Sequence, residues 1–232
     1  MKTEAIPIAA KHDARTSMYS STGGRLTSSF SWKARQGFFK LFLKTFEPGP
    51  TTTVIDVGVT GSDRDIEDNY FEKLYLYTNM ITGVGTEDAS YLEERFPGFR
   101  YVRCDGRDLR FDDKSFDVAF CSAVVEHAGR RDEQEKLIHE ICRVSSKAFV
   151  TTPNRGFFVE VHTNLPFLHY LPVSIHRKIL ASLGWRFFAK EENLNLLYAD
   201  EFLALFPKDR KVRLIKHRLF GIFVSNLIAI VE

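Results

Sequence analysis

The chain has 232 residues, of which 44% are hydrophobic, so it is long enough to bury the core of one large domain. Its formal net charge of +2 argues against a nucleic-acid partner, which requires a strongly basic surface. Three widely spaced cysteines, Cys104, Cys121 and Cys142, match no zinc motif and predict free thiols. We find no signal peptide and no apolar run of membrane-spanning length, and therefore expect a cytoplasmic protein.

The first predicted element is a polar arm of residues 1–31, in which Ser, Thr and Gly cluster. This arm either has no function or folds over a ligand. A helix is predicted for residues 32–46, because Phe38 and Phe42 are four residues apart, as are Phe39 and Leu43, and all lie on one face. Its other face is basic, so the helix either packs on a sheet or makes a peripheral contact with a membrane surface.

Residues 52–57 are apolar and rich in β-branched side chains, which predicts a strand buried on both faces. A turn containing Gly58 and Gly61 follows this strand. In doubly wound sheets such a turn holds nucleotide-like ligands, since glycine allows close approach of the backbone and the next helix presents unpaired N–H groups. The alternative is an ordinary parallel strand with a tight turn.

Strand-like and helix-like segments alternate between residues 52 and 153, which predicts a parallel sheet covered by helices. A closing pair of strands, residues 211–219 and 222–231, is joined so tightly at Gly221 that it must be antiparallel. The expected fold class is α/β, a Rossmann-like doubly wound sheet, mostly parallel, with a C-terminal antiparallel hairpin. The other predicted strands are 80–84, 99–104, 116–122 and 148–152, and the predicted helices are 63–76, 89–96 and 132–144, the last capped by Asp132 and Glu135.

The most specific stretch surrounds the predicted strand 116–122. It reads RCDGRDLRF from Arg103 to Phe111 and SFDVAFCSAVVEH from Ser115 to His127. In these residues the chain resembles the class I S-adenosylmethionine-dependent methyltransferases, and is most similar to the group that includes small-molecule and quinone methyltransferases. The resemblance implies the seven-stranded methyltransferase fold, S-adenosylmethionine as cofactor, and a single domain of residues 32–232.

The glycine turn departs from the pattern of this family, whose first motif is Asp-x-Gly-x-Gly-x-Gly. Asp56 and Gly58 match, but Thr60 and Ser62 replace the second and third glycines, with Gly61 between them. Either the loop is rerouted so that Gly61 serves in their place, or cofactor binding is weakened. We expect Gly58 and Gly61 to approach the methionine part of the cofactor and Asp56 to order the turn.

The resemblance also assigns the remaining cofactor contacts. The acid that usually ends the second strand is absent, but Glu87 follows closely and is our candidate for the ribose hydroxyls, its alternative role being a helix N-terminal acid. Asp105, with Gly106 beside it, would accept a hydrogen bond from the adenine amino group, or is simply a turn residue. Ser122 ends the fourth strand, where the ligand crevice is expected.

His127 titrates near neutrality and is the candidate catalytic base, although in this family such a residue also serves to orient its loop. We interpret residues 154–206 as an insertion that binds the substrate or forms a lid. Its aromatic and histidine-bearing first part suits an apolar or ring-bearing acceptor, or else forms core beneath a long connection. The candidate substrate residues are Asn154, Arg155, His162, His169 and Tyr170.

Methyl transfer from a sulfonium requires alignment of nucleophile, methyl group and sulfur, and it requires no metal; no metal-ligand motif stands out in the sequence. We therefore predict an S-adenosylmethionine-dependent methyltransferase that acts, most readily at oxygen, on a small-molecule, lipid-linked or saccharide acceptor. The altered glycine turn favours a second hypothesis, a catalytically inactive binding protein of the same fold. A nicotinamide-dependent dehydrogenase is a third, disfavoured by the absence of Gly-x-Gly-x-x-Gly. The sequence leaves the oligomeric state open.

Overall fold

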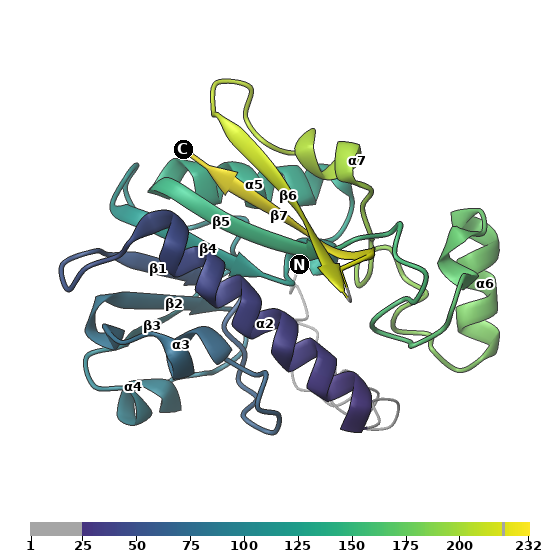
Figure 1. The fold of residues 1–232 in the computed structure, drawn as a ribbon, viewed down its shortest axis with the longest axis horizontal. Coiled ribbons are helices and arrows are strands. Elements are labelled where there is room, and N and C mark those ends of the chain that lie inside the picture. The colour runs from purple at the N-terminus through teal and green to yellow at the C-terminus, as the bar shows by residue number, and fades with distance from the viewer. Residues whose placement is uncertain (1–24, 220) are drawn as a thin grey trace, which may run out of the picture.

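The computed structural model describes residues 25–219 and 221–232 and has a seven-stranded sheet with the order β3-β2-β1-β4-β5-β7-β6 (Figure 1). The first five strands are parallel, and β7 runs antiparallel to both β5 and β6. The predicted fold class is therefore confirmed. The strands are β1 (Val54–Val57), β2 (Ile81–Gly85), β3 (Arg100–Arg103), β4 (Phe116–Ser122), β5 (Ser145–Pro153), β6 (Val212–Leu219) and β7 (Phe223–Val231).

Helices cover the two faces of this sheet, with α2 crossing one face and α5 the other (Figure 1). The described part of the chain contains no helix with the length and apolar character needed to span a membrane. The helices are α2 (Arg25–Phe46), α3 (Tyr70–Leu74), α4 (Tyr91–Arg95), α5 (Arg131–Val144), α6 (Val173–Ser182) and α7 (Ala199–Leu203), with short 3₁₀ segments η1 (Thr78–Met80), η2 (Val125–His127) and η3 (Leu168–Tyr170).

Phenylalanines of α2 form the core on one face. Phe42 is fully buried, and its ring lies 5.1 Å from that of Phe71, 5.4 Å from that of Phe120 and 5.9 Å from that of Phe149. These edge-on contacts join α2 to α3, β4 and β5 in the geometry that aromatic rings prefer. The phenylalanines of the predicted apolar face are thus packed against the sheet, whereas Leu43, predicted on the same face, is exposed.

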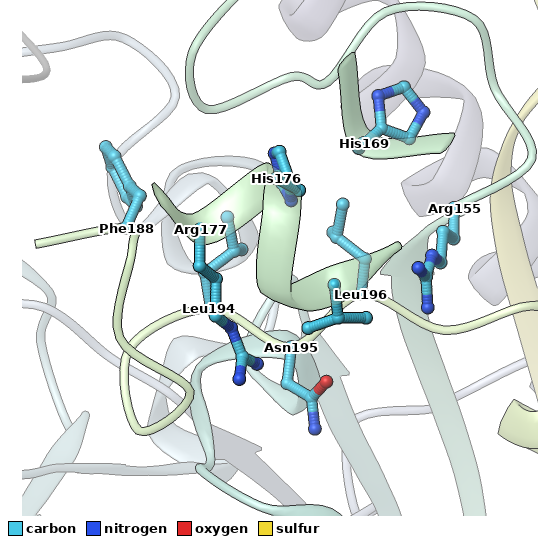
Figure 2. A pocket seen from close by; sticks show the side chains of 9 residues that line it. Arg155, His169, His176, Arg177, Phe188, Leu194, Asn195 and Leu196 are labelled. Atoms are coloured by element: carbon cyan, nitrogen blue, oxygen red, sulfur yellow. The ribbon is translucent and has the colours of Figure 1, made fainter. Parts of the chain in front are cut away.

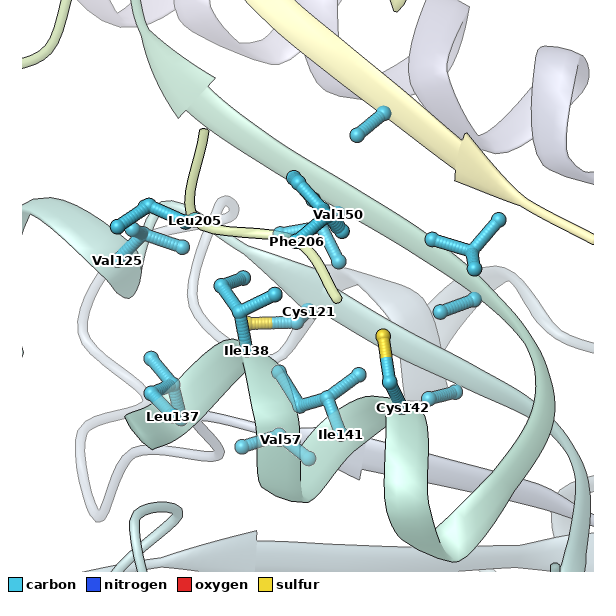
Figure 3. Packing of buried hydrophobic residues seen from close by; sticks show 14 of the residues in the cluster. Val57, Cys121, Val125, Leu137, Ile138, Ile141, Cys142, Val150, Leu205 and Phe206 are labelled. Atoms are coloured by element: carbon cyan, nitrogen blue, oxygen red, sulfur yellow. The ribbon is translucent and has the colours of Figure 1, made fainter. Parts of the chain in front are cut away.

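The core on the other face lies between the sheet and α5 (Figure 3). Helix α5 is amphipathic and directs its apolar side chains toward β1, β4 and β5. The three cysteines are unpaired, and burial raises the pKa of Cys121 and Cys142. The side chains in Figure 3 include Val57, Cys121 and Val150 from the strands, Leu137, Ile138, Ile141 and Cys142 from α5, and Leu205 and Phe206 after α7.

Three local predictions differ from the structure. The helix expected at residues 32–46 begins at Arg25, within the predicted arm, while residues 1–24 of that arm lie outside the described residues. The helix expected at 63–76 is reduced to Tyr70–Leu74. Helix α5 has Arg130 at its N-cap position and no side-chain cap, so Asp132 and Glu135 do not form the expected cap.

The shortened helix has a physical cause in the side chains that precede it. The Asn69 side chain accepts a hydrogen bond from the Thr60 N–H and donates to the carbonyl oxygens of Thr60 and Ser62. The Ser62 hydroxyl donates to Asp68. Such side-chain bonds compete with the helical ones, so residues 62–69 remain a loop that is tied to the glycine turn.

Candidate functional site

Four of the predicted cofactor residues lie at the carboxyl edge of the parallel strands. Gly58 follows β1, Glu87 follows β2, Asp105 follows β3, and Ser122 ends β4. The strand order reverses between β1 and β4, and this switch point is where doubly wound sheets bind their ligands. The fold therefore brings these residues to one edge, although they are far apart in sequence.

The turn after β1 requires glycine at its first position. Gly58 has a φ of +115°, and a Cβ atom placed there would lie 2.2 Å from Cγ2 of Val124, in the segment after β4. The Gly58 N–H donates to the Val84 carbonyl oxygen at 2.8 Å. The backbone of β1 thus turns against β2 and comes close to the end of β4.

Glu87 is bound to the same turn. Its Oε2 accepts hydrogen bonds from the Thr60 hydroxyl at 3.0 Å and from the Gly61 N–H at 3.1 Å. A Cβ atom at Gly61 would lie 2.6 Å from the Asp88 carbonyl oxygen. Thr60, which replaces the second glycine of the family motif, therefore helps to join the turn to the carboxylate after β2.

Asp56 is buried one residue before the turn and lies beside Glu72 of α3, which is also buried. Burial, together with the neighbouring Glu72 carboxyl, raises the pKa of Asp56 well above its ordinary value. Burial likewise raises the pKa of Glu72. The two groups thus retain a proton to a higher pH than exposed carboxyls do. Sequence reasoning missed Glu72, which no motif contains.

Asp105 forms a bidentate ion pair with Arg107, whose Nη2 lies 2.6 Å from Oδ2 and whose Nε lies 2.9 Å from Oδ1. Arg107 also donates to the Ala128 carbonyl oxygen and to Glu133. The Arg107 guanidinium lowers the pKa of Asp105. Gly106 fits closely, since an added Cβ would lie 2.8 Å from both Val57 and Leu137. These bonds occupy the carboxylate expected to accept from adenine.

Ser122 connects the end of β4 to α3 and β5. Its hydroxyl accepts a hydrogen bond from the buried Tyr70 hydroxyl at 3.0 Å and lies 3.0 Å from the hydroxyl of Thr151. Burial raises the pKa of Tyr70, which remains a neutral donor. The next residue, Ala123, has a φ of +58°, so the chain turns sharply where β4 ends.

His127 lies just beyond this turn, in η2, and contacts the predicted insertion. Its Nδ1 lies 2.7 Å from the Asn193 carbonyl oxygen, and its Nε2 lies 3.1 Å from Nε2 of His162. His162 in turn has its Nδ1 2.6 Å from Oε1 of Glu160. The structure thus brings together the candidate base and one of the candidate substrate residues.

Glu160 is a buried carboxylate that anchors this pair. Burial by itself opposes its charge, but His162 and the N–H and hydroxyl of Thr163 stabilise the ionised form. These donors outweigh burial and lower the pKa of Glu160 to about 2. The imidazole of His162 therefore faces a permanent negative charge on its Nδ1 side.

Other candidate substrate residues make contacts within the protein. Asn154 donates to the Val224 carbonyl oxygen and accepts from the Gly156 N–H. Nε2 of His169, which is buried, lies 2.7 Å from the Phe157 carbonyl oxygen. The Tyr170 hydroxyl donates to the Gly156 carbonyl oxygen, and the Arg155 guanidinium lies over the ring of Tyr198 at 5.1 Å.

Comparison with known proteins accords with this arrangement. Residues 69–148 match the family described as "Methyltransferase domain". Phosphoethanolamine N-methyltransferase 2 of Caenorhabditis elegans is 25% identical over 115 residues, which cover 48% of this chain and 26% of that protein. Residues 69–148 thus match a methyltransferase domain, and the sheet has the strand order of the seven-stranded methyltransferase fold. S-adenosylmethionine is the cofactor that this domain implies.

Solved structures share the fold of this chain. Magnesium protoporphyrin IX methyltransferase of Synechocystis PCC 6803, with bound SAH, has a TM-score of 0.56 at 11% identity, and the match covers 97% of this chain and 95% of that one. A Thermotoga maritima methyltransferase described as a possible histamine N-methyltransferase has a TM-score of 0.55 at 15% identity, over 89% and 91% of the two chains. The chain spans about a quarter of the length of its curated relative.

Two hollows of different size are lined largely by residues 154–206, the predicted insertion. The one in Figure 2 has a volume of about 30 Å³ and is lined by Arg155, His169, His176 and Arg177 among others. It has room for about one water molecule. The other, which we call the aromatic pocket, measures about 470 Å³, the size range of small-molecule sites. Its lining consists of Gly156, Phe157, Phe158, Phe167, Tyr170, Phe223 and Val224.

Sequence reasoning found part of the aromatic pocket and missed the rest. Tyr170 was a candidate, and the aromatic content of residues 154–172 indicated such a site. Phe223 belongs to β7, and its ring lies 5.0 Å from that of Phe158. Only the pairing of β7 with β5 brings this residue of the hairpin to the insertion.

Proposed function

We propose that this chain binds S-adenosylmethionine at the carboxyl edge of β1, β2 and β3 and transfers its methyl group to an acceptor in the aromatic pocket. The observation that carries the proposal is that Gly58, Glu87 and Asp105 follow three neighbouring parallel strands, β1, β2 and β3, at the edge of the sheet beside the switch point. A glycine turn after one strand and a carboxylate after each of the next two strands suit a sulfonium-bearing nucleoside.

The residues present fit the cofactor in their chemistry. Gly58 brings a backbone without a side chain of its own to this edge, and Glu87 would bind vicinal ribose hydroxyls through its carboxylate. The bonds from Thr60 and Gly61 would orient that carboxylate. Asp105 would accept from the adenine amino group once Arg107 releases one of its oxygens. When bound, the cofactor supplies the methyl group and a good leaving group.

The acceptor we propose is an apolar or ring-bearing molecule that is methylated at oxygen. The described lining of the aromatic pocket contains no cationic side chain, so it suits rings or acyl chains better than a phosphate. A hydroxyl acceptor must lose its proton, and His127 is the candidate base. A proton on its Nδ1, facing the Asn193 carbonyl oxygen, would leave Nε2 as the basic nitrogen, next to Nε2 of His162.

Titration calorimetry of the full chain with S-adenosylmethionine and its demethylated product tests the cofactor site. We expect saturable binding, and we expect Asp105→Ala to weaken it at least tenfold, since a charge-assisted hydrogen bond contributes about 1.5–3 kcal/mol. Asp112→Ala, which removes an exposed aspartate nearby, is the matched control. Absence of binding to the wild type would refute the proposal, and equal affinity of both variants would mean that the adenine site lies elsewhere.

A transfer assay with methyl-labelled cofactor tests the acceptor. Phenolic and long-chain hydroxylated compounds should become labelled, and Phe167→Ala should raise the acceptor KM while leaving cofactor affinity unchanged. Labelling of amines alone would contradict transfer to oxygen. Cofactor binding without transfer to any acceptor would indicate an inactive protein of this fold.

A further inference from the structure

We infer that Glu126, His127 and His162 form a binding site for one divalent transition-metal ion, with Zn²⁺ and Fe²⁺ as the fitting class. One ligand atom of each residue lies within 4.8 Å of the ligand atoms of the other two. Two imidazoles with one carboxylate are a recurrent ligand set for both ions. We call these three residues the His–Glu cluster.

Both imidazoles are oriented for metal binding. Nδ1 of His127 faces the Asn193 carbonyl oxygen and Nδ1 of His162 faces the Glu160 carboxylate, so a proton on each Nδ1 would have an acceptor. The two Nε2 atoms lie 3.1 Å apart, close to the separation of neighbouring ligands around one ion, and an ion between them would replace the proton that they now share in a hydrogen bond. A carbonyl or carboxylate behind each ligating ring is the usual outer support of such sites.

Glu126 supplies the negative charge that the ion requires. Its side chain is fully buried, Oε2 accepts from the Thr152 hydroxyl at 3.0 Å, and Oε1 has no hydrogen-bond partner among the described residues. An unpartnered buried carboxylate oxygen is costly, and a cation beside it removes that cost. The buried charges of Glu126 and Glu160 together would balance the ion.

The site lies where the core meets the insertion. Glu126 and His127 belong to η2, directly after β4, whereas His162 belongs to the insertion. A bound ion would therefore fix the insertion to the carboxyl edge of the sheet. Three protein ligands leave coordination positions open, as in catalytic rather than structural sites.

A chemical consequence follows, and it rests on the proposed function, whereas the metal site itself does not. With Nε2 of His127 bound to the ion, the imidazole is no longer the base. An acceptor hydroxyl bound at an open position would lose its proton more easily, because the ion lowers the pKa of an oxygen it binds.

Metal-depleted full-length protein titrated with Co²⁺ tests the site by visible absorption. We expect one equivalent to bind and Zn²⁺ to displace it, whereas Mg²⁺, which prefers oxygen ligands, should not. Glu126→Gln retains the size of the side chain, and we expect it to weaken binding at least tenfold, as we do for His162→Gln. His139→Ala removes an exposed histidine on α5 and should leave binding unchanged.

Should either cluster variant fail to fold, Zn²⁺ added to depleted wild-type protein must still raise its Tm in proportion to the logarithm of concentration. No saturable Co²⁺ binding by the wild type, or equal binding by the folded variants, overturns the inference. Metal binding without cofactor binding would refute the proposed function alone, and cofactor binding without metal binding would refute this site alone.

Discussion

At the scale of single residues, the chain places ionisable groups where water cannot reach them and compensates each differently. Glu160 receives donors from His162 and Thr163 and remains charged. Asp56 and Glu72 lie beside each other, and burial raises the pKa of both. The first arrangement fixes an imidazole, whereas the second makes the stability of the fold depend on pH.

We predict that Glu72→Gln stabilises the protein at neutral pH. The folded protein holds a proton on the Asp56–Glu72 pair above the range near pH 4 in which the unfolded chain releases it. The unfolded state therefore binds fewer protons there, and wild-type stability falls as pH rises through that interval. Urea unfolding between pH 4 and pH 8 should show that the variant's free energy of unfolding exceeds that of the wild type by an amount that grows as the pH rises.

Glu94→Gln, an exposed substitution on α4, serves as the control and should follow the wild type at every pH. A constant difference between Glu72→Gln and the wild type across this range would show that the pair does not retain its proton.

At the scale of elements, the packing of α2 on the sheet depends on aromatic side chains in its second half. Phe38, Phe39 and Phe42 are buried, whereas Leu43, the next residue along, is 38% exposed. The periodicity of these phenylalanines predicted the face correctly because burial along a helix repeats every 3.6 residues. Contacts with rings on β4 and β5 fix the orientation of this helix.

Truncation of this contact measures its contribution. We expect Phe42→Ala to lower the free energy of unfolding by about 3–5 kcal/mol, the usual cost of removing a buried phenylalanine ring. Leu43→Ala should cost clearly less, since part of that side chain already contacts water. Guanidinium unfolding of the two variants provides the comparison, and equal losses would mean that the helix is not packed as described.

At the scale of the whole molecule, the end of the insertion packs into the core through Leu197, Phe202, Leu205 and Phe206, whereas an earlier part of it makes polar contacts. Asn195 donates through its N–H to the Glu126 carbonyl oxygen and accepts from the side chain of Gln134, each at 2.8 Å. Helix α6 lies well apart from the sheet (Figure 1), and its buried Leu180 belongs to a small separate cluster with Phe188 and Leu194. Such a region can open without unfolding the sheet.

We therefore expect the amides of α6 to exchange with solvent far faster than those of β4 and β5. Native-state hydrogen exchange followed by mass spectrometry tests this, with the peptide that covers α5 as an internal reference for the core. If the α6 amides were protected as strongly as the β4 amides, the insertion would be part of the same cooperative unit.

The fold was predictable because its signals are local. Alternating buried strands and helices imply a parallel sheet, and the short connection at Gly221 implies an antiparallel pair. Residues 63–69 were predicted wrongly as helix, since the bonds of Asn69 to Thr60 and Ser62 depend on how the loop returns. The 3.6-residue periodicity of apolar side chains does not show where a loop folds back onto an earlier turn.

The candidate site was predictable only in part. The positions of Gly58, Glu87 and Asp105 follow from strand order, because parallel strands end at a common edge. The pairing of Asp105 with Arg107, two residues away, was readable from the sequence and was missed. The contact between His127 and His162 was not readable, since it depends on the path of a long connection without a regular pattern.

The strand order also has a consequence for synthesis. Strand β6 pairs only with β7, and β7 separates it from β5. On the ribosome, residues 212–219 emerge before residues 223–231. Strand β6 and the open edge of β5 therefore stay unpaired until β7 has been synthesised and inserts between them. Unpaired edges of this kind invite association with other nascent chains. The tight reversal at Gly221 shortens that wait, because it places β7 beside β6 as soon as its residues leave the exit tunnel.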